Sequence, residues 1–167
     1  SLYLFTAMES IMSEKGGCTT VPALGGCSAL AVRGQMSATG EPVIVRNFDY
    51  MDTVRPLYTV RKSQPRSGFH SVDFTMAPFA GSVDGMNERG LCITYNYAYT
   101  TDGATPSAPI SIVIAEALQR CSTVSEAAAW IQSHKRWGGG ILMLADADGD
   151  IASLELSSTR AELRRPE

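Results

Sequence analysis

Helical periodicity is confined to two parts of this sequence, and short apolar runs typical of strands fill the rest. Apolar residues recur every three or four positions over residues 2–12, and a second helical part covers 110–120 and 127–135. The two later helices follow each other directly instead of alternating with single strands. This order predicts an α+β fold in which grouped helices pack on a mainly antiparallel sheet.

Pairs of short apolar runs separated by turn residues predict the strands of that sheet. One hairpin turns at residues 38–41 and a second at the acidic residues 146–150, while Asn87 and Gly90 form a turn that leads into another strand. Thr123 and Glu126 form a capping box ahead of the helix at 127–135, and the glycines at 138–140 end that unit. The strands are expected at 29–32, 43–45, 58–60, 91–95, 141–145 and 151–156.

Charge and composition exclude several classes of partner. The net charge of −3 comes without a basic cluster, which argues against nucleic acid and against an anionic membrane surface. Charged residues make up 19% of the chain, below the roughly 25% of an average globular protein, so we expect part of the surface to be covered by other polypeptide. The sequence does not assign a compartment: a cytoplasmic location is favoured slightly, and secretion stays open.

Most familiar catalytic and metal-binding patterns are missing. The four cysteines form no C-x-x-C pair, so we expect reduced thiols, no zinc site and no cofactor. The acidic run from Asp146 to Asp150 lacks the final carboxylate of a calcium loop, because Ser157 stands there. No G-x-S-x-G motif and no phosphate-binding glycine loop occurs. His70 and His134 are expected to be structural.

The pattern that remains combines a thiol, a cation and a carboxylate. Cys27 begins the first strand of the first hairpin, and Arg46 and Asp49 lie at the end of the second strand. Antiparallel pairing brings these three to one end of the sheet. If the Gly26–Cys27 bond is cut, the freed α-amino group of Cys27, with an ordinary pKa of about 7.7–8, can accept the thiol proton. The alternative, which Gly-Gly-Cys favours when taken alone, is a buried cysteine after a turn.

Three segments together resemble a known family. They are Cys27-Ser-Ala-Leu-Ala-Val followed by Arg46-Asn-Phe-Asp49-Tyr, then Gly85-Met-Asn-Glu-Arg-Gly-Leu with Asn96 beyond it, and Gly140-Ile-Leu-Met-Leu-Ala-Asp-Ala-Asp-Gly-Asp-Ile. In this order and spacing they resemble the N-terminal-nucleophile (Ntn) hydrolases of the choloylglycine hydrolase and penicillin acyltransferase (peptidase C45-like) group. The resemblance runs from Cys27 to Leu156.

The resemblance implies roles for four residues and a fold. Cys27 would be the nucleophile and, once freed, its own base; Arg46 and Asp49 would orient its thiol and amine; Asn96 would donate to the oxyanion. The implied fold is an αββα sandwich of antiparallel sheets flanked by helices, with its N-terminal half in this chain. Residues 1–26 would be a propeptide or leading helix and 27–167 the N-terminal part of the domain. Cys18-Thr19-Thr20 is a rival start.

The function expected on this basis is an autoprocessing amidohydrolase or acyltransferase that acts on a small-molecule, linear, non-peptide amide through a thioester on Cys27. The family's later Asn and Arg have no counterpart here, so we expect a C-terminal segment or second chain to complete the fold; a homo-oligomer stays open. Loops at 51–78 and 97–109 would line the substrate pocket. Two alternatives are a non-catalytic α+β module with a buried Cys27, and a thiol enzyme whose base is His70 or His134.

Overall fold

A computed structural model describes residues 26–102 and 106–166 of the chain. The helix expected at 2–12 and the rival start at Cys18 lie outside the described residues. Two short 3-10 helices, η1 (Gly34–Met36) and η2 (Asp52–Leu57), interrupt the strands. The other elements are β1 (Cys27–Val32), β2 (Val43–Phe48), β3 (Tyr58–Ser63), β4 (Ser71–Met76), β5 (Asp84–Asn87), β6 (Cys92–Ala98), β7 (Ala108–Pro109), α2 (Ile110–Arg120), α3 (Val124–Ser133), β8 (Arg136–Trp137), β9 (Gly139–Ala145), β10 (Ile151–Leu156) and β11 (Ala161–Arg164).

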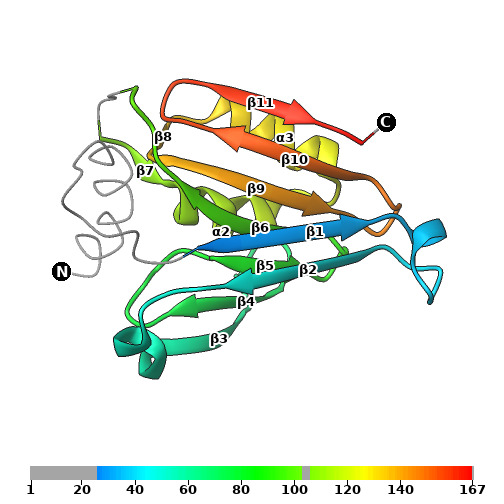
Figure 1. Cartoon of the computed structure of the whole chain (residues 1–167), viewed down its shortest axis with the longest axis horizontal. Helices are drawn as coiled ribbons and strands as arrows, with labels where there is room; N and C mark the ends of the chain where they lie inside the picture. Colours follow the sequence, from blue (N-terminus) through cyan, green and yellow to red (C-terminus); the bar gives the residue numbers. More distant parts are fainter. Residues whose placement is uncertain (1–25, 103–105, 167) are drawn as a thin grey trace.

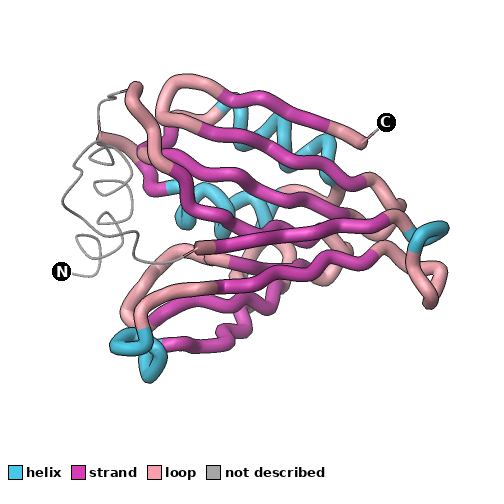
Figure 2. Tube along the Cα trace, in the orientation of Figure 1, coloured by secondary structure: helices cyan, strands magenta, loops and turns pink. Residues whose placement is uncertain are grey.

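The described residues form three layers. A seven-stranded antiparallel sheet of order β11-β10-β9-β6-β5-β4-β3 lies in the middle. The β1–β2 hairpin lies in front of it and contacts β6 and β9, while α2 and α3 pack on the rear face against β5, β6 and β10 (Figures 1 and 2). This arrangement confirms the expected α+β class with grouped helices on antiparallel strands.

The apolar core lies between the seven-stranded sheet and the two helices. In α2 the buried apolar residues recur at helical spacing, and they meet the rear-facing side chains of β6, β9 and β10. Burial of this many aliphatic side chains is the main force that holds the helices on the sheet. The largest fully buried members are Leu91, Ile93, Ile110, Ile114, Leu118, Ile131, Leu142, Leu144 and Leu154.

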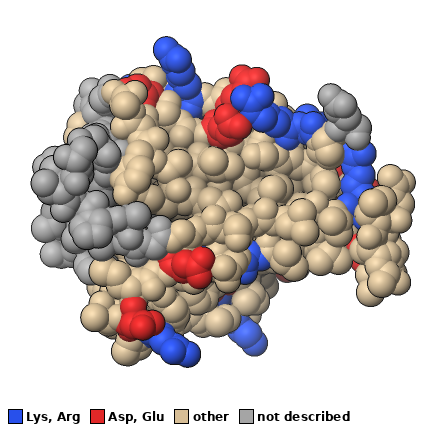
Figure 3. Space-filling view, viewed as in Figure 1, with Lys and Arg blue, Asp and Glu red and all other residues tan. Residues whose placement is uncertain are grey.

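The β1–β2 hairpin has two different faces. Its register pairs Cys27 with Phe48 and Leu30 with Val45, so alternate residues point toward the large sheet or away from it. The inward residues are half-buried, whereas Leu30 and Val45 on the outward face are 59% and 52% exposed. Few charged side chains lie over this outward face (Figure 3). The hairpin therefore presents an apolar strip away from the sheet.

Asn87 forms the turn between β5 and β6 and also ends α2. Its Oδ1 accepts hydrogen bonds from the backbone N–H groups of Arg89 (3.0 Å) and Leu91 (3.1 Å). Its Nδ2 donates to the carbonyls of Leu118 and Cys121, both at 2.8 Å. The expected turn is confirmed, and one buried amide also satisfies carbonyls that the end of a helix leaves without partners.

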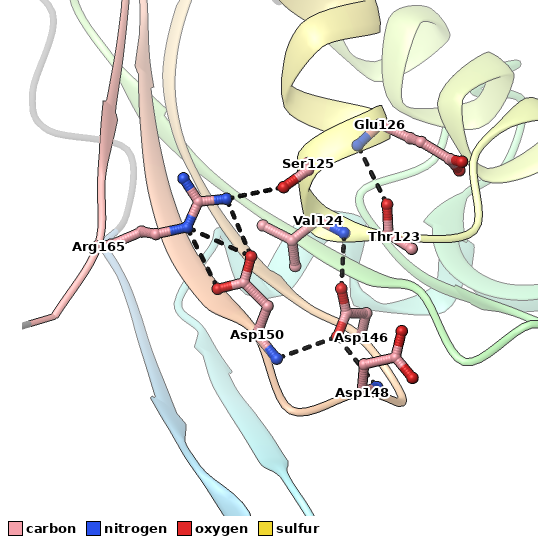
Figure 4. Close-up of polar contacts among 8 residues, drawn as sticks. All are labelled: Thr123, Val124, Ser125, Glu126, Asp146, Asp148, Asp150 and Arg165. Atoms are coloured by element: carbon pink, nitrogen blue, oxygen red, sulfur yellow. Dashed lines mark hydrogen bonds and ion pairs between the residues drawn. The ribbon is translucent and has the colours of Figure 1, made fainter.

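The start of α3 is fixed from two sides. Thr123 Oγ1 accepts the backbone N–H of Glu126 as expected. The Glu126 carboxylate, however, accepts from the backbone N–H and hydroxyl of Ser122 and not from the backbone N–H of Thr123, as a full capping box would require. Asp146 Oδ2 accepts the backbone N–H of Val124 at 2.8 Å (Figure 4). The acidic turn therefore caps a neighbouring helix as well as forming a hairpin.

Several boundaries differ from the sequence prediction. The second later helix ends at Ser133 rather than at 135, because Arg136 leaves it to pair in β8 and its guanidinium donates to the Ile131 and His134 carbonyls. The glycines at 138–140 were expected to end the helical unit, but Gly139 and Gly140 begin strand β9. A side chain at Gly140 would collide with the Tyr95 ring, so this strand position requires glycine.

The strands β4, β5 and β11 and the two-residue strands β7 and β8 were not predicted from the sequence. Strand β4 buries polar residues, Ser71, Asp73 and Thr75, on its helix-facing side, so it lacks the usual apolar alternation. Most of the segment at 51–78, which we expected to be a pocket-lining loop, forms η2, β3 and β4.

Candidate active site

Cys27 and Arg46 meet between the hairpin and the large sheet. Both point inward from paired strands, and Arg46 Nη2 donates to Cys27 Sγ at 3.1 Å. The Arg46 side chain is 6% exposed, and its guanidinium carbon lies 4.7 Å from the centroid of the Phe48 ring. A buried cation in contact with a thiol stabilises the thiolate, which is the reactive form.

Asp84 provides the countercharge for this buried cation. Its Oδ1 lies 2.8 Å from Arg46 Nε, and its side chain is 20% exposed. Burial raises the pKa of Asp84 to about 6, although Arg46 and the Tyr95 N–H both act to lower it. The carboxyl group is therefore mostly ionised and paired with Arg46 at neutral pH. Asp84 was not among the residues predicted from the sequence, because nothing in its local pattern links it to Arg46 on another sheet.

The same two side chains also bind both backbone groups of one residue of β6. Strand β5 pairs with β6 only as far as Thr94, opposite Asp84. At the next residue, the Tyr95 N–H donates to Asp84 Oδ1 at 3.3 Å, and the Tyr95 carbonyl accepts from Arg46 Nη2. Side chains thus continue the hydrogen-bonded ladder where the neighbouring strand has ended.

Asp49 lies at the entrance to β1, next to Gly26. Its backbone N–H donates to the Gly26 carbonyl at 2.8 Å. Its exposed carboxylate accepts from Asn47 Nδ2 at 3.0 Å, and Oδ2 lies 3.9 Å from the position that a side-chain carbon would take at Gly26. The structure therefore places a carboxylate beside the Gly26–Cys27 bond.

Asn96 lies on the front face of β6, two residues beyond Thr94. It is half-buried, and within the described part of the chain its buried Oδ1 has no hydrogen-bond partner. A buried polar atom without a partner is costly and commonly marks a site that a ligand or water completes. Strands β1 and β6 contact each other, which brings Asn96 to the same inter-sheet layer as Cys27.

An aromatic cluster lies next to Arg46. The Phe48 ring stacks on Tyr50 at 5.6 Å between centroids and meets Tyr58 and Phe74 edge-on, each at 5.5 Å. All four rings are half-buried. They offer an apolar surface beside the thiol, which is chemically suited to contact a hydrocarbon or aromatic group.

Other nucleophiles and bases of the described chain are placed differently. Burial raises the pKa of Cys92 to about 12 and that of Cys121 to about 11, so both thiols are inert at neutral pH. His70 lies 3.6 Å from a Glu88 carboxylate oxygen, and His134 stacks on Trp130 at the exposed end of α3. Neither histidine is hydrogen-bonded to Cys27 in the structure.

Residues 26–102 and 106–166 offer little basis for other kinds of site. No His, Cys, Asp or Glu side chains in this part of the chain cluster in a way that could hold a metal ion. None of its helices is long and apolar enough to cross a membrane. A cavity of about 240 Å³ lies beside α2 on the rear face, but its charged residues, Arg61 and Asp73, already pair with each other at 2.6 Å.

Comparison with protein families gives one match, over residues 36–167. The matching family is described as acyl-coenzyme A:6-aminopenicillanic acid acyl-transferase. The matched range includes Arg46, Asp49, Asp84 and Asn96, whereas Cys27 precedes it. No curated protein sequence matches the chain.

Comparison with solved structures shows what the fold is similar to. An N-acylethanolamine-hydrolyzing acid amidase ortholog from Caenorhabditis elegans aligns with a TM-score of 0.67 and 16% identity, covering 84% of this chain and 64% of that one. A mutant conjugated bile acid hydrolase from Clostridium perfringens aligns with a TM-score of 0.58 and 15% identity, covering 85% and 51%. The chain thus spans less than two thirds of either structure. At this level of identity the likeness establishes the fold alone.

Proposed function

The chain belongs to the family of acyl-coenzyme A:6-aminopenicillanic acid acyl-transferases, within the Ntn-hydrolase group, and on this premise we propose that it is an Ntn amidohydrolase or acyltransferase. Its substrate is a small molecule with a linear, non-peptide amide bond. The acyl group passes through a thioester on Cys27, and water or a second amine releases it. The proposal covers the whole protein of which this chain forms at least a part.

The contact between the Cys27 thiol and the Arg46 guanidinium carries this proposal. A structural cysteine needs no buried cation, and burying a guanidinium is costly even where a carboxylate pairs with it, as Asp84 does here. The position of Asp49 supports the same assignment, because its carboxylate would lie beside the ammonium group that forms when the Gly26–Cys27 bond is cut.

The proposed reaction begins with the freed α-amino group of Cys27, which accepts the thiol proton. The sulfur attacks the amide carbonyl carbon, and the carbonyl oxygen gains negative charge that an Asn96 amide N–H stabilises. The C–N bond then breaks, and the departing amine takes the proton back. Water or an acceptor amine attacks the thioester and releases the acyl group, which restores the thiol.

Processing and completion of the fold are further parts of the proposal. Residues 1–26 form a propeptide or leading segment, and residues 27–167 form the N-terminal part of the catalytic domain. Further polypeptide, in the same chain or in a second one, completes the domain against the apolar outward face of β1–β2. The exposure of Leu30 and Val45 and the partial coverage of the solved structures support this arrangement.

Intact-mass measurement after storage at neutral pH tests the proposal. We expect the wild-type chain to lose residues 1–26, and Cys27→Ala to stay intact. Cys121→Ala is the matched control, because this cysteine is buried at the end of α2 and should leave cleavage unchanged. Loss of residues 1–17 instead would assign the start to Cys18.

Incubation with a panel of N-acyl amides tests the acyl-transfer step. We expect a mass increase equal to one acyl group on the peptide that carries Cys27. A chain that stays intact and is never acylated would favour the non-catalytic α+β module. Loss of acylation in His70→Ala or His134→Ala, with Cys27 in place, would favour the histidine-dependent thiol enzyme.

A further inference from the structure

We propose that Asp84 is a positioning residue that holds Arg46 against the thiol of Cys27. Asp84 is not hydrogen-bonded to Cys27 and acts on it through the Arg46 guanidinium, which contacts both. The inference that this helps catalysis rests on the proposed function, whereas the effect on the thiol itself does not.

The contacts of the Arg46 guanidinium with Asp84, Tyr95 and Cys27 support this inference. Arg46 reaches across the inter-sheet layer from β2, and its side chain is long and flexible enough to take many conformations. Two contacts limit it to one: the ion pair of Nε with Asp84 Oδ1 at 2.8 Å, and the bond from Nη2 to the Tyr95 carbonyl. In that conformation Nη2 also reaches Cys27 Sγ at 3.1 Å.

Asp84 is itself held in place, which makes it a suitable anchor. It begins β5, opposite Phe74 of β4 and Thr94 of β6, and its carboxylate accepts the Tyr95 N–H. Asp84 and Arg46 therefore bind the N–H and the carbonyl group of the same residue, Tyr95 of β6. Removal of the carboxylate would leave a 6%-exposed guanidinium without a countercharge, and it would turn toward water and away from the sulfur.

A second ion pair, whose carboxylate is buried, supplies a matched control. Arg61 of β3 pairs with Asp73 of β4 at 2.6 Å, and the Asp73 side chain is 2% exposed. This pair also joins strands of the large sheet, but it lies on the helix-facing side. Asp73→Asn therefore reports the general cost of losing a buried carboxylate without disturbing Cys27.

The experiment measures alkylation of Cys27 by iodoacetamide against pH, in the full chain, with peptide masses resolving each cysteine. Asp84→Asn is expected to raise the pH midpoint by about one unit, so that the rate at neutral pH falls about tenfold. Asp73→Asn is expected to leave the midpoint unchanged. An unchanged midpoint in Asp84→Asn would overturn the proposal. So would a lower midpoint, which would mean that Arg46 stays in place and its field at the sulfur grows.

A double-variant comparison tests whether Asp84 acts only through Arg46. Arg46→Gln alone and Arg46→Gln with Asp84→Asn are expected to give the same midpoint; a further shift in the double variant contradicts the proposal. The double variant removes both buried charges, so it keeps the test available if Asp84→Asn does not fold. Alkylation needs no turnover, so these results stand apart from any failure of self-cleavage or acylation in the wild-type chain.

Discussion

Asp84 ties the stability of the protein to pH in a direction opposite to that of an ordinary salt-bridged carboxylate. Its pKa is about 6 in the folded chain against 3.8 for the free side chain. Below about pH 3 the carboxyl group is protonated in both states. As pH rises toward 6, the unfolded chain loses its proton first, so the unfolded state gains stability relative to the folded one.

The free energy of unfolding of the wild type, relative to Asp84→Asn, should therefore fall as pH rises from about 4 to about 6. The fall is expected to be at most about 3 kcal/mol, since two pKa units correspond to about 2.7 kcal/mol. Urea unfolding of both proteins at several pH values measures it. The use of a difference cancels carboxylates such as Asp150 and Glu155, whose pKa values are lowered by Arg165 and Arg164. A constant or rising difference would contradict the assignment.

Asn96 is expected to act on the rate and not on stability. Its buried Oδ1 has no hydrogen-bond partner in the described chain, so Asn96→Ala breaks no hydrogen bond to that oxygen. Loss of one oxyanion donor typically lowers kcat by about a hundredfold to a thousandfold, with little change in KM. Steady-state kinetics on the best amide of the panel measures both constants. Thr94→Val, two positions earlier on the same face, should leave kcat unchanged; an equal loss in both variants would remove Asn96 from the mechanism.

At the level of elements, Asn87 joins the β5–β6 turn to the end of α2 through four hydrogen bonds. Asn87→Ala should lower the free energy of unfolding by about 3 kcal/mol, because several buried backbone groups lose their partners together. Chemical denaturation measures this loss. Glu88→Ala, at the neighbouring exposed position, should change stability by less than about 0.5 kcal/mol. Similar values for the two variants would show that water replaces the Asn87 contacts.

The elements that the sequence predicted are those with a local signal. The helix at 110–120 has apolar residues on one face at helical spacing, and the hairpins have apolar runs around turn residues, so each pattern is decided within a few positions. The strands β4 and β5 lacked such a signal, because buried Asp73 and Asn87 are stabilised by partners that are distant in sequence. The end of the helix at Ser133 depends in the same way on Arg136, whose role appears only after β8 pairs with β7.

The candidate site shows the same division. Cys27, Arg46 and Asp49 could be proposed from their residue types and the expected pairing of one hairpin, and Asn96 from the resemblance to a known family. Asp84 could not, because its contact with Arg46 joins two sheets, and sequence spacing does not predict how a hairpin lies on another sheet. The roles of all five residues stay predictions until the variants are measured.

At the scale of the whole molecule, the composition and the outward face of the hairpin point the same way. Charged residues are fewer than in an average protein, and Leu30, Val43 and Val45 form an exposed apolar strip on β1–β2. In a complete domain we expect other polypeptide to cover this strip. The 167-residue chain by itself should therefore associate through it.

Sedimentation of the 167-residue chain at rising concentration tests this expectation. We expect the average mass to increase with concentration, and Leu30→Glu with Val45→Glu to keep the chain monomeric, since two carboxylates cannot be buried in an apolar contact. Val60→Glu is the control: this residue is 70% exposed and lies on the edge strand β3 of the large sheet, not on the hairpin. If Val60→Glu alone abolishes association, the contact is made by the edge of the large sheet and not by the hairpin. A wild-type chain that is monomeric at every concentration would mean that the apolar strip does not mediate association.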